Sequence, residues 1–237
     1  MLNNKFFLLP IALLAVSSSA LIVRLLPDTN AITIAFWRML LASIMVFMLS
    51  YKTLLVFVPT KEMLFAGIFL GIHFALFFRG VQLTSIAEAS LLGTTAPIFT
   101  GIYGFIFQKN PLVPKVVFGL FLAFVGAGAL VSQGSFSETG ALGNILALLS
   151  SIAISYVLVA GKEIRKSFNV FEYTRWLFFF AAATLFVISL FVNVSVFTIS
   201  TTEFPWFVFL ALVPTVIGHN IFYLSLIHIS EPTRRRG

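Results

Sequence analysis

The sequence predicts an all-α, polytopic membrane protein, and three observations carry this prediction. Of its 237 residues, 59% are hydrophobic and only 10% are charged, whereas a soluble domain carries about 25% charged residues. The mean hydropathy is +1.06, which is more apolar character than a soluble core can enclose. The apolar residues also fall into long runs of about 20 residues, the length that crosses a bilayer as a helix.

Eight apolar runs qualify as spanning helices. They are Phe6–Val23, Ala31–Leu49, Met63–Phe78, Ala87–Phe107, Val116–Val131, Ala141–Ala160, Trp176–Val194 and Trp206–Leu226. Short connections with helix breakers separate several of them, at Pro27-Asp28, Pro59-Thr60 and Asn110-Pro111. The first run also fits a signal peptide, because small residues occur at Ser17–Ala20, but its continuation to Val23 favours a retained helix.

The positive residues predict the orientation. If the helices alternate in direction, one side receives Lys5, Lys52, Lys61, Lys109, Lys115, Lys162, Arg165, Lys166 and Arg175, and the other receives only Arg24 and Arg79. Lys and Arg accumulate on the cytoplasmic side, so we expect a multi-pass protein of the cytoplasmic (inner) membrane with a cytoplasmic N-terminus. The net charge of +7 is scattered between apolar runs, which argues against nucleic acid as a partner.

A polar, turn-rich stretch at Ser132–Gly140 divides the chain into two related parts. Gly67–Leu83 aligns with Ala211–Ile227, and Ala12–Ser17 in the first run resembles Ala147–Ser151 in the sixth. The similarity is weak, but it indicates a repeated unit of five helices. An odd number of spans inverts the second copy, and inverted repeats are typical of secondary transporters. The stretch itself is predicted to be an external hinge.

Several segments together resemble the drug/metabolite transporter superfamily, EamA-type. The resemblance covers nearly all of residues 6–223 and implies ten helices in two inverted five-helix repeats, of which eight are present here. It also implies export or import of small metabolites through a central cavity. The segments are Ala35–Ala42, Gly71–Phe78, Ala87–Phe99, Gly119, Gly126 and Leu212–Asn220.

Two features depart from the family pattern. Gln108-Lys109 stands where family members commonly have Glu, and helices nine and ten are missing. The segment Leu224–Arg234 matches the translation of a sequencing adapter, so it is expected to be non-native. A genuine basic tail that binds anionic lipid is the alternative. The predicted organisation is a first repeat at 1–131, the hinge at 132–140, a partial second repeat at 141–223 and a non-native tail at 224–237.

Small and kinking residues mark helix contacts and bends. Gly67 and Gly71 lie one turn apart, and Gly143, Ala147, Ser151 and Ser155 follow at intervals of four, so these stripes are expected to pack helices closely. Thr94 belongs to a similar stripe of the fourth helix. Pro97 and Pro214 each remove a backbone hydrogen bond and should bend their helices. The carbonyls that they free need partners, which makes both prolines candidate walls of a cavity.

Ionisable and polar residues at membrane depth are the candidate substrate-binding groups. Arg38 lies roughly 10 Å into its helix at 1.5 Å per residue; it is expected either to snorkel or pair with Glu88, or to contact substrate. His73 and His219 are expected either to be structural or to orient substrate or accept a proton. The aromatic candidates, Trp37 and Tyr156, are expected either to make ring contacts with the substrate or to serve in ordinary packing. The full set is Trp37, Arg38, His73, Glu88, Thr94, Tyr156, Thr215, His219 and Asn220.

These observations predict a secondary transporter that exports small organic metabolites, such as amino acids or amines, across the cytoplasmic membrane. A channel and a non-transporting structural subunit are the alternatives. The sequence lacks the motifs of metalloproteases, serine hydrolases and nucleotide-binding enzymes, so no enzymatic activity, cofactor or metal is expected. The expected partners are the lipid bilayer and a small-molecule substrate, with a homodimer left open.

Overall fold

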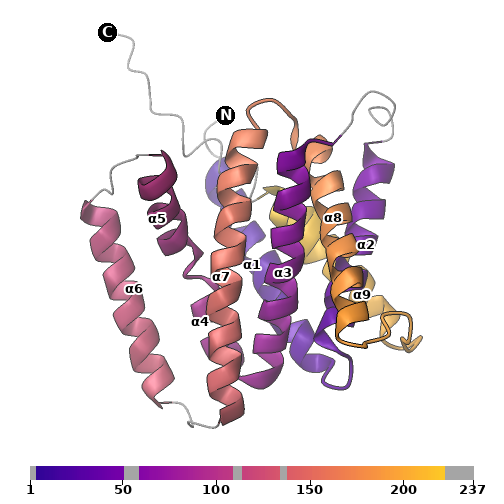
Figure 1. The fold of residues 1–237 in the computed structure, drawn as a ribbon, viewed down its shortest axis with the longest axis horizontal. Coiled ribbons are helices and arrows are strands. Elements are labelled where there is room, and N and C mark those ends of the chain that lie inside the picture. Colours follow the sequence, from indigo (N-terminus) through magenta and orange to yellow (C-terminus); the bar gives the residue numbers. More distant parts are fainter. Residues whose placement is uncertain (1–3, 51–58, 109–113, 134–137, 222–237) are drawn as a thin grey trace.

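The chain forms helices that lie side by side and alternate in direction (Figure 1). The computed structural model describes residues 4–50, 59–108, 114–133 and 138–221. Its helices are α1 (Asn4–Leu25), α2 (Ala31–Leu49), α3 (Lys61–Leu83), α4 (Ile86–Gly93), α5 (Ala96–Gln108), α6 (Pro114–Gln133), α7 (Glu138–Ile164), α8 (Val170–Phe191), α9 (Phe204–Leu210) and the π-helix η2 (Ala211–His219). No strand occurs in these ranges, which confirms the predicted all-α class.

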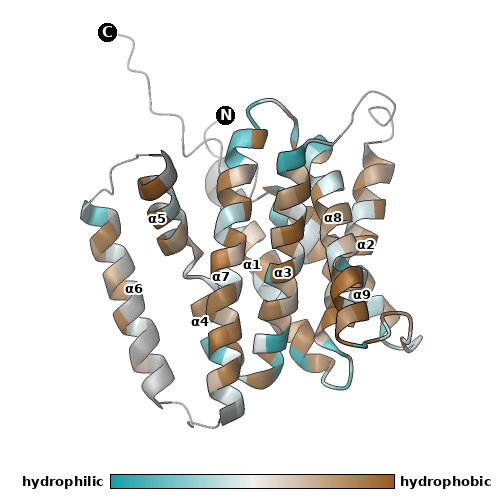
Figure 2. Ribbon diagram, viewed as in Figure 1, coloured by the Kyte–Doolittle hydropathy of each residue, from teal (hydrophilic) through white to brown (hydrophobic). Residues whose placement is uncertain are grey.

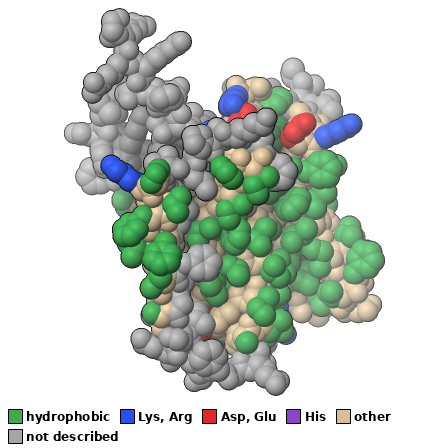
Figure 3. Space-filling model, turned by 60° about the vertical axis from the view of Figure 1, so that its left-hand side comes forward, with side chains coloured by type: hydrophobic (Ala, Val, Ile, Leu, Met, Phe, Trp, Pro, Cys, Tyr) green, Lys and Arg blue, Asp and Glu red, His purple; other side chains and the backbone are tan. Residues whose placement is uncertain are grey.

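Within the described residues, five helical stretches are long and apolar enough to cross a membrane. They are Ala31–Leu49, Lys61–Leu83, Ile86–Ile106, Thr139–Ile164 and Val170–Phe191, and shorter apolar helices occur at Pro10–Leu25 and Phe204–His219. Figure 2 shows the hydrophobic colouring along the middle of the helices, with hydrophilic residues mainly near their ends. Figure 3 shows a face covered by hydrophobic side chains, with charged ones mainly near its upper edge. Such an apolar surface suits lipid contact.

Several helices are longer than predicted because their first turns are polar. Thr60 caps α3, its hydroxyl accepting from the backbone N–H of Met63 at 3.4 Å. Asn169 and Glu172 form a capping box at the start of α8, which begins six residues before the predicted Trp176. Polar caps stabilise a helix start, whereas a search for apolar runs excludes them. The predicted hinge is correspondingly shorter, because α6 reaches Gln133 and α7 starts at Glu138.

Two predicted helices depart from one regular α-helix, and each contains one of the prolines expected to bend it. The predicted helix Ala87–Phe107 is split at Thr94–Thr95 into α4 and α5, just before Pro97. The predicted helix Trp206–Leu226 is continuous over its described part but changes from the α-helix α9 to the π-helix η2, with Pro214 inside η2. Residues 222–226 of this prediction lie outside the described residues. A proline cannot donate to the carbonyl four residues earlier, so the regular α-helical ladder fails at both places.

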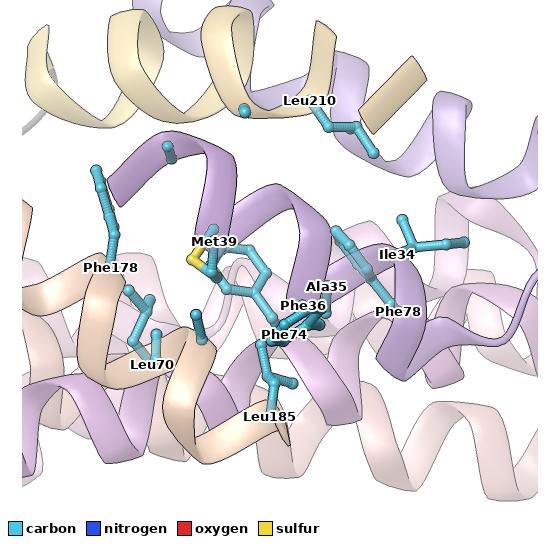
Figure 4. Close-up of a cluster of buried hydrophobic side chains, with 14 of the residues drawn as sticks. Ile34, Ala35, Phe36, Met39, Leu70, Phe74, Phe78, Phe178, Leu185 and Leu210 are labelled. Atoms are coloured by element: carbon cyan, nitrogen blue, oxygen red, sulfur yellow. The ribbon is translucent and has the colours of Figure 1, made fainter. Parts of the chain in front are cut away.

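The core forms where α2 and α3 meet α8. Figure 4 shows Met39 of α2, Phe74 of α3 and Leu185 of α8 within one cluster of buried side chains. The predicted stripe of α3 packs closely: a Cβ added to Gly67 would lie 2.3 Å from Cβ of Phe180, and one added to Gly71 would lie 2.8 Å from Cβ of Thr184. The packing role predicted for these glycines is therefore confirmed.

Hydrogen bonds connect the loops at the end of the bundle where α3 ends and α9 begins. Arg24 of α1 donates from Nη1 to the carbonyls of Val81, Gln82 and Thr84, at 2.9, 3.1 and 3.3 Å. The side chain of Gln82 donates to the carbonyl of Thr29 at 2.8 Å, and the hydroxyl of Thr29 donates to Glu203. We call these four side chains, Arg24, Thr29, Gln82 and Glu203, the end network.

Candidate functional site

Arg38 is the centre of a buried polar cluster that joins three elements. Its side chain is only 1% exposed. Nε donates to the hydroxyl of Thr215 in η2 at 2.7 Å, and Nη1 donates to the hydroxyl of Ser19 in α1 at 3.1 Å. Nη2 lies 3.3 Å from Nε2 of His219, also in η2. The guanidinium is thus fixed by neutral partners from both ends of the chain instead of reaching toward the membrane surface.

The π-helix η2 positions the hydroxyl of Thr215 to accept a hydrogen bond from Arg38. Pro214 has no N–H to donate to the carbonyl of Leu210, four residues earlier. The hydroxyl of Thr215 bonds the Leu210 carbonyl at 2.7 Å. Because its proton is used there, the hydroxyl oxygen presents lone pairs to Arg38. The bend predicted at Pro214 therefore positions the residue that binds the arginine.

Aromatic rings of α3 cover the other side of the guanidinium. Its central carbon lies 4.3 Å from the ring centroid of Phe74 and 5.5 Å from that of Phe78. The ring of Phe74 also meets His219, with centroids 6.0 Å apart. Cation–π contacts of this kind strengthen in a desolvated site. These contacts with Phe74 and Phe78 stabilise the positive charge of Arg38 in the apolar interior.

His73 lies on the far side of Phe74 and is held by α7. Nδ1 donates to the carbonyl of Ser150 at 2.8 Å, since a carbonyl can only accept. The imidazole stacks on Phe77, with centroids 5.8 Å apart and an interplanar angle of 8°. Its centroid is 4.8 Å from that of Phe74. His73 therefore neighbours the Arg38 cluster through a ring.

The break between α4 and α5 is closed by hydroxyl groups, one of them from α7. Ser151 donates to the carbonyl of Leu92 at 2.5 Å and accepts from the hydroxyl of Thr95 at 3.1 Å. Thr95 also reaches the Leu92 carbonyl at 2.6 Å. These bonds satisfy the Leu92 carbonyl beside the break, five residues before Pro97. The Pro97 side chain itself is exposed.

Asn220 follows the cluster at the end of η2. It is 5% exposed, yet neither its amide nitrogen nor its amide oxygen has a hydrogen-bond partner among the described residues. Burying an unpaired amide costs free energy. A substrate with both a donor and an acceptor would satisfy it.

Four other predicted residues lie outside the Arg38 cluster. Trp37 donates from Nε1 to the carbonyl of Val196 at 2.7 Å. Glu88 closes a capping box with Ser85 at the start of α4. Thr94 is exposed and donates to the carbonyl of Leu91 in its own helix. Tyr156 packs on Phe69, with ring centroids 4.4 Å apart.

The expected pairing of Arg38 with Glu88 is wrong. The Thr84 and Ser85 hydroxyls bond Glu88 at 2.6 and 2.8 Å, whereas Arg38 turns to Ser19 and to η2. The physical reason is local: a Glu three residues after a Ser cap is held by the helix start. Snorkelling of Arg38 is also wrong, because its side chain is buried.

Sequence reasoning missed Ser19, Thr95 and Phe74. Ser17–Ala20 was weighed only as a cleavage site, although Ala12, Ala15 and Ser19 follow the helical spacing of one buried face. Thr95 stands beside the predicted Thr94, and a shift of the helix break by one residue decides which of them is buried. Phe74 is one of many Phe residues, and nothing in the sequence singles it out.

The described residues thus define a class: an integral, helical membrane protein with a buried polar cluster between α1, α2, α3 and η2. The chain belongs to the EamA-like transporter family, which it matches over residues 5–132 and 141–235. It is a transporter of the EamA drug/metabolite type, as the sequence predicted, and members of this family are generally not enzymes. The second matched segment includes most of the tail expected to be non-native, which lies outside the described residues.

Individual relatives agree with this assignment. The chain is 28% identical over 151 residues to the uncharacterized transporter YyaM of Bacillus subtilis (strain 168), covering 61% of this chain and half of that protein. It is 25% identical over 239 residues to an uncharacterized transporter of Archaeoglobus fulgidus, covering 95% of this chain and 81% of that protein. A protein crystal structure matches with a TM-score of 0.70 and 16% identity, over 94% of this chain and 79% of that one, which supports the fold.

Proposed function

We propose that this protein is a secondary transporter that exports small organic metabolites, such as amino acids or amines, and binds them at the Arg38 cluster. The observation that carries the proposal is the burial of Arg38 between α1, α2, α3 and η2, where Thr215, Ser19 and His219 hold it. A buried charge at membrane depth is costly, and substrate pathways are where such charges persist. Thr215, His219 and Asn220 of η2 complete the proposed binding surface, with His73 behind Phe74.

The packing of the helices supports an inverted-repeat plan with 1–131 and 141–223 as the two units. If α1 corresponds to α7, α2 to α8 and α3 to the α9–η2 pair, the contacts form a symmetric set. The helices α2 and α8 pack on each other, and the contact of α3 with α7 has its counterpart in the contact of η2 with α1. Such a pseudo-twofold relationship allows two halves to rock against each other around a central site.

Between the two substrate types, Arg38 favours amino acids. A guanidinium binds a carboxylate by two parallel, charge-assisted hydrogen bonds, whereas an amine without a carboxylate meets a like charge. The amide of Asn220, which has no hydrogen-bond partner among the described residues, can bind the same carboxylate or a neighbouring amino group. A zwitterionic amino acid therefore suits this set of groups better than a simple amine.

We place the protein in the cytoplasmic membrane with its N-terminus in the cytoplasm. Lys61 begins α3, Lys115 lies in the first turn of α6, and Lys162 lies in the last turn of α7. These three ends lie at the same end of the bundle in Figure 1, as the positive-inside rule requires for the cytoplasmic side. The lipid bilayer surrounds the apolar face, and a homodimer remains compatible with it.

The test is substrate binding and flux by the chain in proteoliposomes. Thermal stabilisation would first be screened across amino acids, amines and nucleoside-like metabolites, and flux would then be measured for the compounds that stabilise the protein. We expect saturable flux that related compounds inhibit competitively. Ser19→Ala should lower apparent affinity about tenfold or more, since one hydrogen bond to a charged group contributes about 1.5–3 kcal/mol. The matched control is Ser18→Ala, whose hydroxyl bonds only Ala15 of its own helix.

Other outcomes would support the alternative functions. Flux that rises linearly with concentration without saturation would indicate a channel. The absence of flux together with a stable partner on purification would indicate a structural subunit. If Arg38→Ala leaves a saturable flux unchanged, the protein is a transporter but its substrate does not bind at Arg38.

A further inference from the structure

The contact between Arg38 and His219 fixes the state of the imidazole. Nη2 of Arg38 lies 3.3 Å from Nε2 of His219. A guanidinium has donors and no acceptor, so Nε2 of His219 must be the acceptor. A ring nitrogen accepts only through a lone pair that carries no proton. The cluster therefore contains His219 as a neutral ring with its proton on Nδ1.

We propose that Nε2 of His219 is the coupling-proton site of this transporter, an inference that rests on the proposed function. Binding of a proton at Nε2 and the present contact with Arg38 exclude each other. Protonation would turn the acceptor into a second donor and place two positive charges within the 3.3 Å that now separate the nitrogens. Like charges at this distance repel strongly where water is excluded.

The guanidinium has a defined response to this repulsion. Its other two contacts use different nitrogens, Nε toward Thr215 and Nη1 toward Ser19. Thr215 and His219 both belong to η2. If η2 stays in place, a guanidinium that moves away from the imidazole strains its bond to Thr215. A proton on His219 therefore pushes η2 and α2 apart. This converts proton binding into separation of two helices from different halves of the chain.

Few other titratable groups face His219 from the elements packed on η2. In α2, Arg38 is the one charged residue, α9 carries none, and α1 carries Lys5 and Arg24 near its two ends. From α3, His73 approaches by way of Phe74, but its Nδ1 is bound to the carbonyl of Ser150. Within the described part of the chain, Arg38 is therefore the charge that a proton on His219 meets first.

The chain itself offers a direct way to test this switch. It contains no Cys, so one introduced thiol is the only thiol present. Ala35 and Ala42 flank Arg38 at helical spacing on the same face of α2, and both are 0% exposed. Ala35→Cys and Ala42→Cys would each be made in the full chain, in lipid nanodiscs, and treated with a water-soluble maleimide. Dividing each labelling rate by that of the denatured protein at the same pH removes the titration of the thiol.

We expect the normalised rate at one or both positions to rise on the order of tenfold, a typical size for coupling between two sites. The rise should come as the pH falls from neutral to the lowest pH at which the chain stays folded, because burial and repulsion by Arg38 oppose the proton on His219. His219→Gln should abolish the rise, because an amide oxygen accepts from Arg38 and cannot be protonated in this range. Arg38→Gln should abolish it too, since no charge is left to repel the imidazolium. The control is His228→Gln, which removes the His of the C-terminal tail at 224–237 and should keep the rise.

Two results would overturn the proposal: a rise that persists in His219→Gln, or a folded wild-type chain whose rates at both positions do not depend on pH. If Arg38→Gln folds poorly, His219→Gln alone decides, because it keeps the hydrogen bond to Arg38. Substrate flux in vesicles separates this inference from the proposed function. Saturable flux without any pH response rejects the proton site and keeps transport, whereas a pH response without flux rejects transport and leaves a proton-driven change of structure.

Discussion

Thr215 connects the proline-containing π-helix η2 to the buried charge of Arg38. Its hydroxyl donates to the carbonyl of Leu210 at 2.7 Å and accepts from Nε of Arg38 at 2.7 Å. In the π-helical pattern of η2 the carbonyl of Leu210 faces residue 215, five positions later, so the Thr215 hydroxyl can reach it. One side chain therefore bonds the backbone of its own helix and an arginine 177 residues away in the sequence.

Replacing Thr215 by Val should destabilise the protein by roughly 1–3 kcal/mol, because it removes the hydrogen bond between this hydroxyl and the buried guanidinium of Arg38. Thr215→Ser keeps the hydroxyl and should retain most of the stability. Unfolding in mixed micelles measures both. Thr184→Val is the matched control, since the hydroxyl of Thr184 bonds only Phe180 of its own helix. A Thr215→Val variant as stable as this control would contradict the role given to the hydroxyl.

Ser151→Ala should loosen the break between α4 and α5. The substitution removes the donor that α7 offers to the Leu92 carbonyl and the acceptor for Thr95. We expect backbone hydrogen exchange around Leu92–Ala96 to become about tenfold faster, which corresponds to about 1.4 kcal/mol of local stability. Ser155→Ala, one turn along α7, removes only a bond to Ile152 of the same helix and should leave this exchange unchanged. Equal effects of the two substitutions would count against a bridge from Ser151.

Gly71→Ala should be far more damaging than Gly126→Ala. A Cβ at position 71 would lie 2.8 Å from Cβ of Thr184 and 2.9 Å from the carbonyl oxygen of Ala181, whereas one at 126 meets nothing within 4 Å. Overpacking of this kind typically costs 1–3 kcal/mol. Gly126→Ala should be neutral or stabilising by up to about 1 kcal/mol, the difference in helix propensity. Thermal unfolding of both variants in detergent checks the contrast, which would fail if their midpoints agreed.

Arg38→Ala and Glu88→Ala should act independently. Arg38 binds η2 and α1, whereas Glu88 caps α4. Their effects on unfolding free energy should therefore add within about 0.5 kcal/mol in the double variant, with a cost of about 1 kcal/mol for the lost cap. Transport should fall with Arg38→Ala and should change little with Glu88→Ala. A coupling well above 0.5 kcal/mol would restore the direct pairing that the sequence suggested.

The membrane class and the irregular helices were predictable because each follows from local chemistry. Apolar runs locate spans whose solvent is lipid, and Pro97 and Pro214 each remove a donor wherever the helix lies. The ends of α3 and α8 were not predictable from apolarity, because polar caps such as Thr60 and Asn169 extend a helix beyond its apolar part.

The sequence predicts which residues belong to the site, but it does not predict which of them contact one another. Arg38, Thr215 and His219 stand out as polar groups at depth, yet their meeting depends on the packing of α2 against η2. Pairing of Arg38 with Glu88 is one of the alternatives that the sequence allows, because opposite charges attract, but the Ser three residues before Glu88 is a closer partner. Long-range contacts decide such cases, and one sequence does not contain them.

Thr29 of the end network belongs to the loop between α1 and α2 and connects two helix ends. Its carbonyl accepts from Gln82 at the end of α3, and its hydroxyl donates to Glu203 at the start of α9. One loop residue therefore ties α3 to α9, and any displacement of one helix end relative to the other must break one of these two hydrogen bonds.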